Sequence, residues 1–399
     1  MTDTRGPLGV LRGAQPGTHG VGGMELFFDL VYVFTIIQLS HYLLHHLSWT
    51  GAAEAVILFA AVWWGWNYTA WALNWMDPQH VAVRVLMAVF MLCALGMAVA
   101  IPTAFGAGAG LFVGAYLLFQ LLRAGFMAAA FGRTQMGRNY TQLLIWSALA
   151  GVVWTVGVFV PEEHRLAVWV LAVLVDYLGP AAQFWVPGLG GSRMSTWPVD
   201  EAHLAERCRL VFIIALGESI LILGNTLIEA ELTGEVVLAA LIGFAALVML
   251  WWLYFSTRHG NAEHETPQTE EAAAMARAAY AYAHALMVGG AIVWAVAIEL
   301  VVAHPHDPAD WTVITVLTAG PGLYLLGNLI FVRARSGRIA RSRLIALLVL
   351  LASVPLGLQL TTTGAAAVVA LVLLVLLLST ARVRQSSRPA DVASAESAV

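Results

Sequence analysis

The segment MELFFDLVYVFTIIQLSHYL, residues 24–43, is apolar enough to form a membrane-spanning helix, yet it carries two acids near its start. Glu25 and Asp29 are one helical turn apart, so they share one side of a helix with Tyr32 and Ser40. An aspartate at mid-membrane costs about 2.5–3.5 kcal/mol, whereas the helix dipole stabilises an acid by only about 0.3–1 kcal/mol. The two acids therefore predict either a structural ion pair or a polar site.

The composition of the whole chain indicates a membrane protein. Apolar residues make up 60% of 399 positions, charged residues only 11%, and the mean hydropathy is +0.79, whereas a soluble domain carries about 25% charged residues. We expect the lipid bilayer to surround much of the chain. The net charge of −4 gives no reason to expect a nucleic-acid partner, and the start of the chain does not resemble a cleavable signal peptide.

The basic residues and the cysteines exclude several kinds of cofactor site. All 20 basic residues are arginine, so a lysine Schiff base to retinal or pyridoxal phosphate is excluded. The two cysteines, Cys93 and Cys208, give neither a disulfide framework nor the spacing of metal ligands. We therefore predict no cofactor and no metal site.

Hydropathy divides the chain into candidate spans, each near the 20 or so residues that cross a bilayer. Pro355, Gly357 and Gly364 interrupt the final apolar run and divide it into the last two candidates. We predict an all-α polytopic bundle of about twelve transmembrane helices, near residues 25–45, 52–73, 81–101, 108–131, 140–160, 165–186, 207–228, 236–256, 279–302, 312–332, 343–360 and 364–381.

The arginines predict the topology, because short cytoplasmic loops collect positive charge. Arginines gather in both terminal segments and in the even-numbered connections, whereas the odd-numbered connections carry acids; Arg165 is the exception. The pattern predicts a multi-pass membrane protein with both termini in the cytoplasm.

The two halves of the chain resemble each other in three places, in the same order and six spans apart. YLLFQLLR at 116–123 is similar to YLLGNLIF at 324–331, and FAAVWWGWNY at 59–68 to FAALVMLWWLY at 244–254, while Glu25 and Glu206 open equivalent spans. These similarities predict a parallel six-plus-six repeat, an architecture that is common in transporters. The expected regions are a cytoplasmic tail 1–24, halves 25–186 and 207–381, a cytoplasmic connection 187–206 and a disordered cytoplasmic tail 382–399.

Four motifs carry a resemblance to a known family. ELFFDLVYVFTIIQLSH at 25–41, WWGWNYTAWALNWMD at 63–77, ERCRLVFIIALGESILILG at 206–224 and WWLYF at 251–255 resemble the bacterial low-temperature-requirement A (LtrA) family over about residues 20–380. The resemblance implies a multi-spanning membrane protein and no agreed biochemical activity.

The seventh span carries the second set of candidate site residues. On a helical wheel His203, Arg207, Glu218 and Asn225 fall within about 60° of one another. Glu218 lies deep in the span between Gly217 and Ser219, and ionisable residues inside a membrane usually face the interior of the bundle. This polar stripe indicates a site, although an internal hydrogen-bond network is the alternative.

Other polar residues complete the candidate set. Asn67 and Tyr68 lie among tryptophans of the second span, and His284 lies in the ninth. We expect Arg84 and Arg123 to be the charge partners of the carboxylates.

These features leave three classes of function open. The first is a secondary transporter of a small molecule or ion. Glu25, Asp29 and Glu218 could bind and release protons and so couple transport to a proton gradient. The second is an intramembrane acid–base enzyme acting on an apolar substrate through Glu218, His203 and His284, although no G-x-S-x-G or HExxH motif occurs. The third is a structural or sensory membrane protein. The sequence does not identify the substrate or the oligomeric state.

Overall fold

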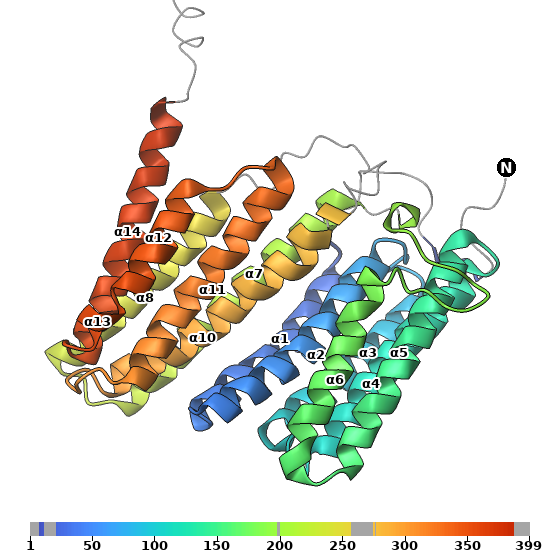
Figure 1. Ribbon diagram of the computed structural model, residues 1–399, viewed down its shortest axis with the longest axis horizontal. Helices are drawn as coiled ribbons and strands as arrows, with labels where there is room; N and C mark the ends of the chain where they lie inside the picture. Colours follow the sequence, from blue (N-terminus) through green and yellow to red (C-terminus); the bar gives the residue numbers. More distant parts are fainter. Residues whose placement is uncertain (1–7, 12–20, 198–199, 257–273, 276, 387–399) are drawn as a thin grey trace, which may run out of the picture.

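The structure of the chain is a computed structural model that describes residues 8–11, 21–197, 200–256, 274–275 and 277–386. In this part of the chain the secondary structure is helical, with three isolated β-bridges and no strand. Helices are expected where backbone groups face lipid, because a helix satisfies its own N–H and C=O groups. The predicted all-α polytopic bundle is confirmed (Figure 1).

The first half of the chain forms one group of helices. Their apolar residues surround each helix almost evenly, as expected for helices buried in protein and lipid. The group consists of α1 Gly23–His45, α2 Trp49–Leu73, α3 Val81–Ala100, η1 Ile101–Thr103, α4 Ala109–Phe131, α5 Gln135–Phe159 and α6 Glu162–Ala181.

The second half forms another group, reached through a connection that contains η2, Met194–Thr196. Its first member, α7, is the longest helix in the described residues. The group consists of α7 Glu201–Glu229, α8 Gly234–Ser256, η3 Ala278–Ala283, α10 His284–Ala303, α11 Trp311–Ser336, α12 Arg341–Ala352, α13 Val354–Gly357 and α14 Thr362–Ser386.

Helices occupy all twelve predicted positions, and ten helices in the described residues are long and apolar enough to cross a membrane. The other two positions are α2 and the α12–α13 pair. Helix α2 packs against α1, α4, α6 and α7, so few of its side chains need to face lipid. Helix α12 ends at Ala352 and α13 contains Pro355, which explains why this run is short.

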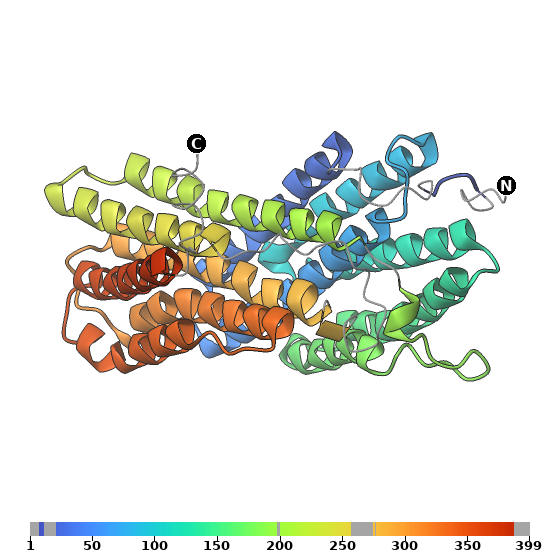
Figure 2. The same cartoon turned by 90° about the horizontal axis from the view of Figure 1, so that it is seen from above.

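The two groups meet along α1. Figures 1 and 2 show α1–α6 on one side and α7–α14 on the other. Helix α1 packs against α7 and α10, and α2 also touches α7. The polar residues of α1 therefore lie at the boundary between the groups and away from lipid.

Helices α10 and α11 approach each other through glycines. A Cβ atom at Gly290 would lie 2.6 Å from the carbonyl oxygen of Gly320, and one at Gly327 would lie 2.5 Å from that of Ala283. No side chain fits at either position, so the two backbones pack directly. Small residues at such contacts are typical of membrane helices, which gain little from hydrophobic burial against one another.

Arg165 is the arginine that departs from the topological pattern, and its surroundings account for it. The side chain is buried and its guanidinium donates to the backbone carbonyls of Phe105, Gly106 and Gly157. It holds the ends of α5 and α6 against the connection that follows η1. Arg165 thus has a structural use that does not depend on membrane orientation.

The predicted tails lie mostly outside the described residues. Residues 1–7, 12–20 and 387–399 are not described, so the expected disorder of 382–399 concerns them only in part. Helix α14 continues to Ser386, so the boundary expected at residue 382 is too early.

Candidate functional site

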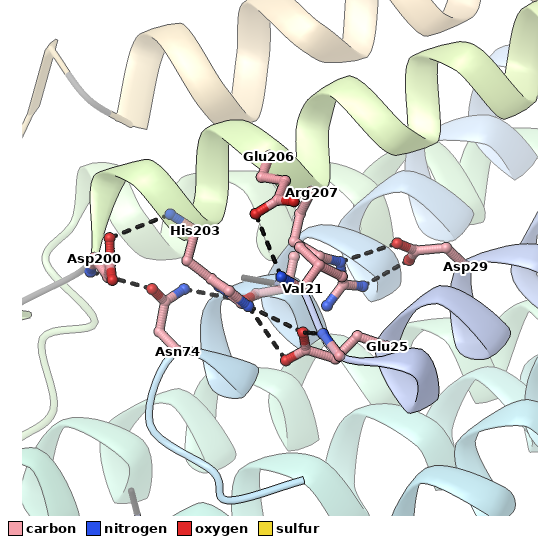
Figure 3. A network of polar contacts seen from close by, with 10 residues as sticks. Val21, Glu25, Asp29, Asn74, Asp200, His203, Glu206 and Arg207 are labelled. Atoms are coloured by element: carbon pink, nitrogen blue, oxygen red, sulfur yellow. Dashed lines mark hydrogen bonds and ion pairs between the residues drawn. The ribbon is translucent and has the colours of Figure 1, made fainter. Parts of the chain in front are cut away.

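The N-terminal turns of α1 and α7 lie side by side and join the two helix groups. Both carboxylate oxygens of Glu25 lie near Nε2 of His203, at 3.1 and 3.2 Å. The Glu25 carboxylate also accepts the N–H of Gly22 at 3.0 Å. Figure 3 shows the two side chains directed towards each other, and because both are buried the pair is shielded from lipid.

One turn deeper, Asp29 pairs with Arg207. Arg207 donates from Nε and Nη2 to the two Asp29 oxygens, at 2.9 and 2.6 Å. The indole of Trp66 on α2 adds a third hydrogen bond to Asp29, at 2.8 Å. Both charged side chains are fully buried, and a buried pair of this kind is tolerated only with good geometry and further hydrogen bonds.

Backbone contacts extend this network around the start of α7. Asp200 caps the helix by accepting the N–H groups of Ala202 and His203. Its own N–H donates to the side-chain oxygen of Asn74, and Glu206 accepts the N–H of Val21 (Figure 3). Three separate segments of the chain are therefore fixed at this end of the boundary.

Two nitrogens of the network keep free hydrogen-bonding capacity. Nδ1 of His203 and Nη1 of Arg207 are buried and have no partner in the described part of the chain. Buried polar atoms are usually paired, so each such atom calls for an explanation. A bound water or the acceptor group of a ligand would satisfy them.

Glu218 lies apart from these pairs, 11 positions further along α7. Its side chain is 4% exposed, and Oε2 is buried without a partner in the described residues. The hydroxyl of Ser219 beside it likewise has no partner in the part of the chain that the structure describes. Glu299 on the neighbouring helix α10 lies within electrostatic range of Glu218, and His45 and Glu229 lie within range of Glu299, although no hydrogen bond or ion pair joins these side chains in the described residues. Glu218 therefore belongs to a second polar cluster, towards the opposite ends of α1 and α7.

Glu299 was missed as a site residue from the sequence. The useful signal was its position as the one acid within the apolar run 284–303. Its partner lies on another helix, so sequence spacing alone does not reveal it.

Two predicted site residues lie outside both clusters. Asn225 is exposed on α7, so the interior polar stripe ends at Glu218 and does not continue through the membrane. His284 is buried, but its ring bonds to the hydroxyl of Tyr254 and the carbonyl of Ala279, both in the second half. The helical-wheel prediction that Asn225 faces the interior was wrong, because neighbouring helices do not cover the side chain of Asn225 near the C-terminal end of α7.

The two arginines expected as charge partners pair with no carboxylate among the described residues. Arg84 is held near the start of α3, where it donates to the carbonyl of Pro78 and to Gln79. Arg123 is fully buried, donates to the carbonyl of Gly65 and to Gln120, and lies over the ring of Tyr68. The expectation was wrong because Arg207, on the facing helix, already occupies both oxygens of Asp29.

Asn67 and Tyr68 line a separate aromatic pocket on another face of α2. The pocket is bounded by α2, α5, the α6–α7 connection and the residues around η3. Nδ2 of Asn67 and the hydroxyl of Tyr68 are buried there without a partner in the described residues. Apart from Asn225 and His284, the predicted site residues thus fall into three places: the α1–α7 pairs, the surroundings of Glu218 and this pocket.

The chemistry available at these places is proton exchange and polar recognition. The carboxylates of Glu218 and Glu299 can bind and release protons, while Asp29 is held by a permanent cation. The described residues contain no group of three histidines, cysteines or acids that could hold a metal ion.

Comparisons with known proteins give a family match and a similar protein. Residues 21–378 match the family described as bacterial low temperature requirement A protein (LtrA). An uncharacterized protein of Rhizobium meliloti (strain 1021) is 34% identical over 334 residues, which are 83% of this chain and 82% of that protein. The described fold, with its many apolar helices, is that of a multi-pass membrane protein.

Proposed function

The chain belongs to the bacterial low temperature requirement A (LtrA) family of membrane proteins, and from this premise we propose that it is a proton-coupled secondary transporter of a small molecule. Its polar site lies between two six-helix halves, residues 25–186 and 207–381. The halves are joined by a cytoplasmic connection, residues 187–206. The protein resides in the bacterial cell membrane with both termini in the cytoplasm.

The observation that carries this proposal is the position of Glu218. An ionised carboxylate is costly to bury without a partner, whereas the protonated acid is neutral. Glu218 is buried, Oε2 has no partner in the described residues, and Glu299 is a second acid whose charge acts on it. Ionisable groups of this kind form proton relays in membrane transporters.

The location of the cluster also supports transport. Glu218 and Glu299 belong to α7 and α10, the two helices of the second half that pack against α1 of the first half. His45, which acts on Glu299, ends α1. A change in the packing between the halves would therefore alter the surroundings of the acids directly.

The helix packing supports the duplication of the chain. In the first half the packed pairs are α1–α2, α1–α3, α2–α4, α2–α6, α3–α4, α4–α5 and α5–α6. The second half contains the same pairs in the same order, namely α7–α8, α7–α10, α8–α11, α8–α14, α10–α11, α11–α12 and α12–α14. Two equivalent halves about an axis along the membrane normal are a common transporter architecture, with the site between them.

The ion pairs Asp29–Arg207 and Glu25–His203 have a distinct part in this proposal. They hold the halves together at one end of the boundary, while Glu218 and Glu299 lie towards the other end. We assign the pairs to a gate that is closed in this structure. Opening that side requires the first turns of α1 and α7 to separate.

A flux measurement tests the proposal. Proteoliposomes containing the purified protein and an internal pH dye are exposed to a panel of organic anions, cations and neutral solutes. The proposal predicts that at least one solute moves protons above the level of protein-free liposomes, and that Glu218→Gln abolishes this flux while the protein remains folded. Glu231→Gln is the matched control, because Glu231 is exposed. Full flux in Glu218→Gln would contradict the proposed mechanism.

A further inference from the structure

Asp176 is an acid of the first half that the proposed mechanism does not use. It is the one acid between Glu163 and Asp200, and it lies on α6 within the otherwise apolar run 166–181. Its hydrogen-bond partners in the described residues are neutral. An ionisable residue within a membrane span that has no counter-ion is a candidate functional site.

Two buried side chains hold one oxygen of this carboxylate. The hydroxyl of Tyr116 on α4 donates to Oδ2 of Asp176 at 2.9 Å, and the indole of Trp154 on α5 donates to the same oxygen at 3.0 Å. Oδ1 accepts no hydrogen bond from the described residues, and Asp176 is partly exposed. A proton can therefore be added at Oδ1 without breaking either bond to Oδ2.

A permanent cation fixes the direction of the hydrogen bonds that lead to Asp176. Arg123 can only donate, and its Nη2 donates to Oε1 of Gln120. The amide nitrogen of Gln120 therefore faces the other way and donates to the oxygen of Tyr116, at 2.8 Å. Because that oxygen already accepts a hydrogen bond, the Tyr116 proton is directed to Asp176. Every bond in this chain, from the cation to the carboxylate, donates towards Asp176.

The charge on Asp176 determines how strongly this chain holds together. A hydrogen bond to an ionised acceptor is shorter and about twice as strong as one between neutral groups. The titratable and charged groups within electrostatic range of Asp176 in the described residues are Arg123, Tyr68, Tyr116 and Tyr177, with no second carboxylate among them. Adding a proton to Asp176 therefore weakens the attachment of α6 to α4 and α5.

The chain ends on α2, which also bonds to the α1–α7 pairs. Arg123 donates from Nη1 to the carbonyl of Gly65 on α2, at 3.1 Å. On α6, the hydroxyl of Tyr177, the residue after Asp176, donates to another backbone carbonyl of α2 at 3.0 Å. Helix α2 in turn reaches the α1–α7 pairs through Trp66. The charge on Asp176 thus acts on α2 by two routes.

We propose that Asp176 is a second proton-binding site, inside the first half of the protein. Oδ1 takes up the proton while Oδ2 stays bonded to Tyr116 and Trp154, and the change in charge is transmitted to α2 through Gln120 and Arg123. Proton binding at Asp176 does not depend on transport, whereas its use in coupling rests on the proposed function.

Infrared difference spectroscopy with isotope-labelled aspartate tests the proposal. The full-length protein in nanodiscs is titrated with acid, and the labelled aspartate carboxyls separate its bands from those of Glu218 and Glu299. We expect a labelled protonated-carboxyl band that titrates with pH, is lost in Asp176→Asn and is retained in Asp307→Asn, because Asp307 is exposed. Asparagine still accepts both hydrogen bonds, so the unfolding midpoint of Asp176→Asn should stay close to that of the wild type.

Tyr116→Phe gives a second readout that does not depend on the folding of Asp176→Asn. It removes one donor to the ionised carboxylate, so the labelled band should persist to a pH about one unit higher than in the wild type. Identical labelled bands in the wild type and Asp176→Asn, or an unchanged titration in Tyr116→Phe, would overturn the proton site. The expected bands in a protein that shows no proton flux would support the site and contradict the transporter.

Discussion

Asp29 on α1 and Arg207 on α7 form a fully buried, two-pronged ion pair that joins the two helix groups of the protein. Two acids open an otherwise apolar helix because their partners lie on the facing helix. Asp29 meets Arg207 and Glu25 meets His203, so neither carboxylate reaches lipid. The free-energy cost that the sequence implies is thus avoided by pairing within the protein.

Removing Asp29 should destabilise the fold strongly. Asp29→Ala leaves Arg207 buried without its counter-ion and Trp66 without its acceptor, so we expect a loss of about 3–5 kcal/mol. The double variant Asp29→Leu/Arg207→Met should lose much less than the sum of the single variants. Thermal unfolding in nanodiscs measures both, with Asp307→Ala as a control, because Asp307 is exposed in its contact with His304. Additive losses in the double variant would contradict the pairing.

Glu218 should respond in the opposite way. Glu218 lacks a cationic partner in the described residues. Glu218→Leu therefore removes a buried polar group without leaving a buried counter-ion unpaired. We expect the midpoint of thermal unfolding to be unchanged or raised. A large drop would show that the carboxylate holds helices together, which favours the structural class of function.

The contact between α10 and α11 should tolerate no added side chain. A Cβ atom at Gly290 would also lie 2.8 Å from the backbone nitrogen of Tyr324, so Gly290→Ala should cost about 1–3 kcal/mol through overpacking. Gly224→Ala on α7 is the matched control, because nothing lies within 4 Å of the added Cβ atom. Alanine is the better helix former, so the control should be neutral or slightly stabilising. Equal stabilities of the two variants would contradict the close contact.

The proposed orientation can be tested with reporter fusions. Fusions at Arg335 and at the C-terminus should give cytoplasmic signals, whereas a fusion at Glu231 should report the periplasm. The expectation follows from the distribution of arginines, with Arg165 explained by its bonds to backbone carbonyls at the end of α5 and in the connection that follows η1. A periplasmic Arg335 would reverse the orientation and place the α1–α7 pairs near the outside.

The sequence predicts the helices well, because each helix in a membrane must satisfy its own backbone and shows this as a long apolar run. The division of the last run at Pro355 follows from the same local chemistry. The sequence also indicates that Glu25, Asp29, His203 and Arg207 face the interior of the bundle, since placing a charge in lipid is costly. Helical periodicity gives the direction of a side chain on its own helix, which is sufficient for these four.

The partners could not be predicted, because they depend on which helices face each other. Arg123 and Arg84 are as plausible in sequence as Arg207, yet only Arg207 faces Asp29 across the α1–α7 contact. Glu299 is coupled to Glu218 through the packing of α7 on α10, 81 positions away in sequence. The sequence pattern likewise cannot show that neighbouring helices leave the side chain of Asn225 on α7 uncovered.

The central claim is that Glu218 exchanges a proton at a buried site between the halves, and infrared difference spectroscopy tests it most directly. Spectra of the protein in nanodiscs are recorded during a pH titration and compared with those of Glu218→Gln, with Glu231→Gln as the control. The account predicts a protonated-carboxyl band in the wild type and in Glu231→Gln that titrates with pH and is absent from Glu218→Gln. Identical carboxyl spectra in the wild type and Glu218→Gln would contradict it.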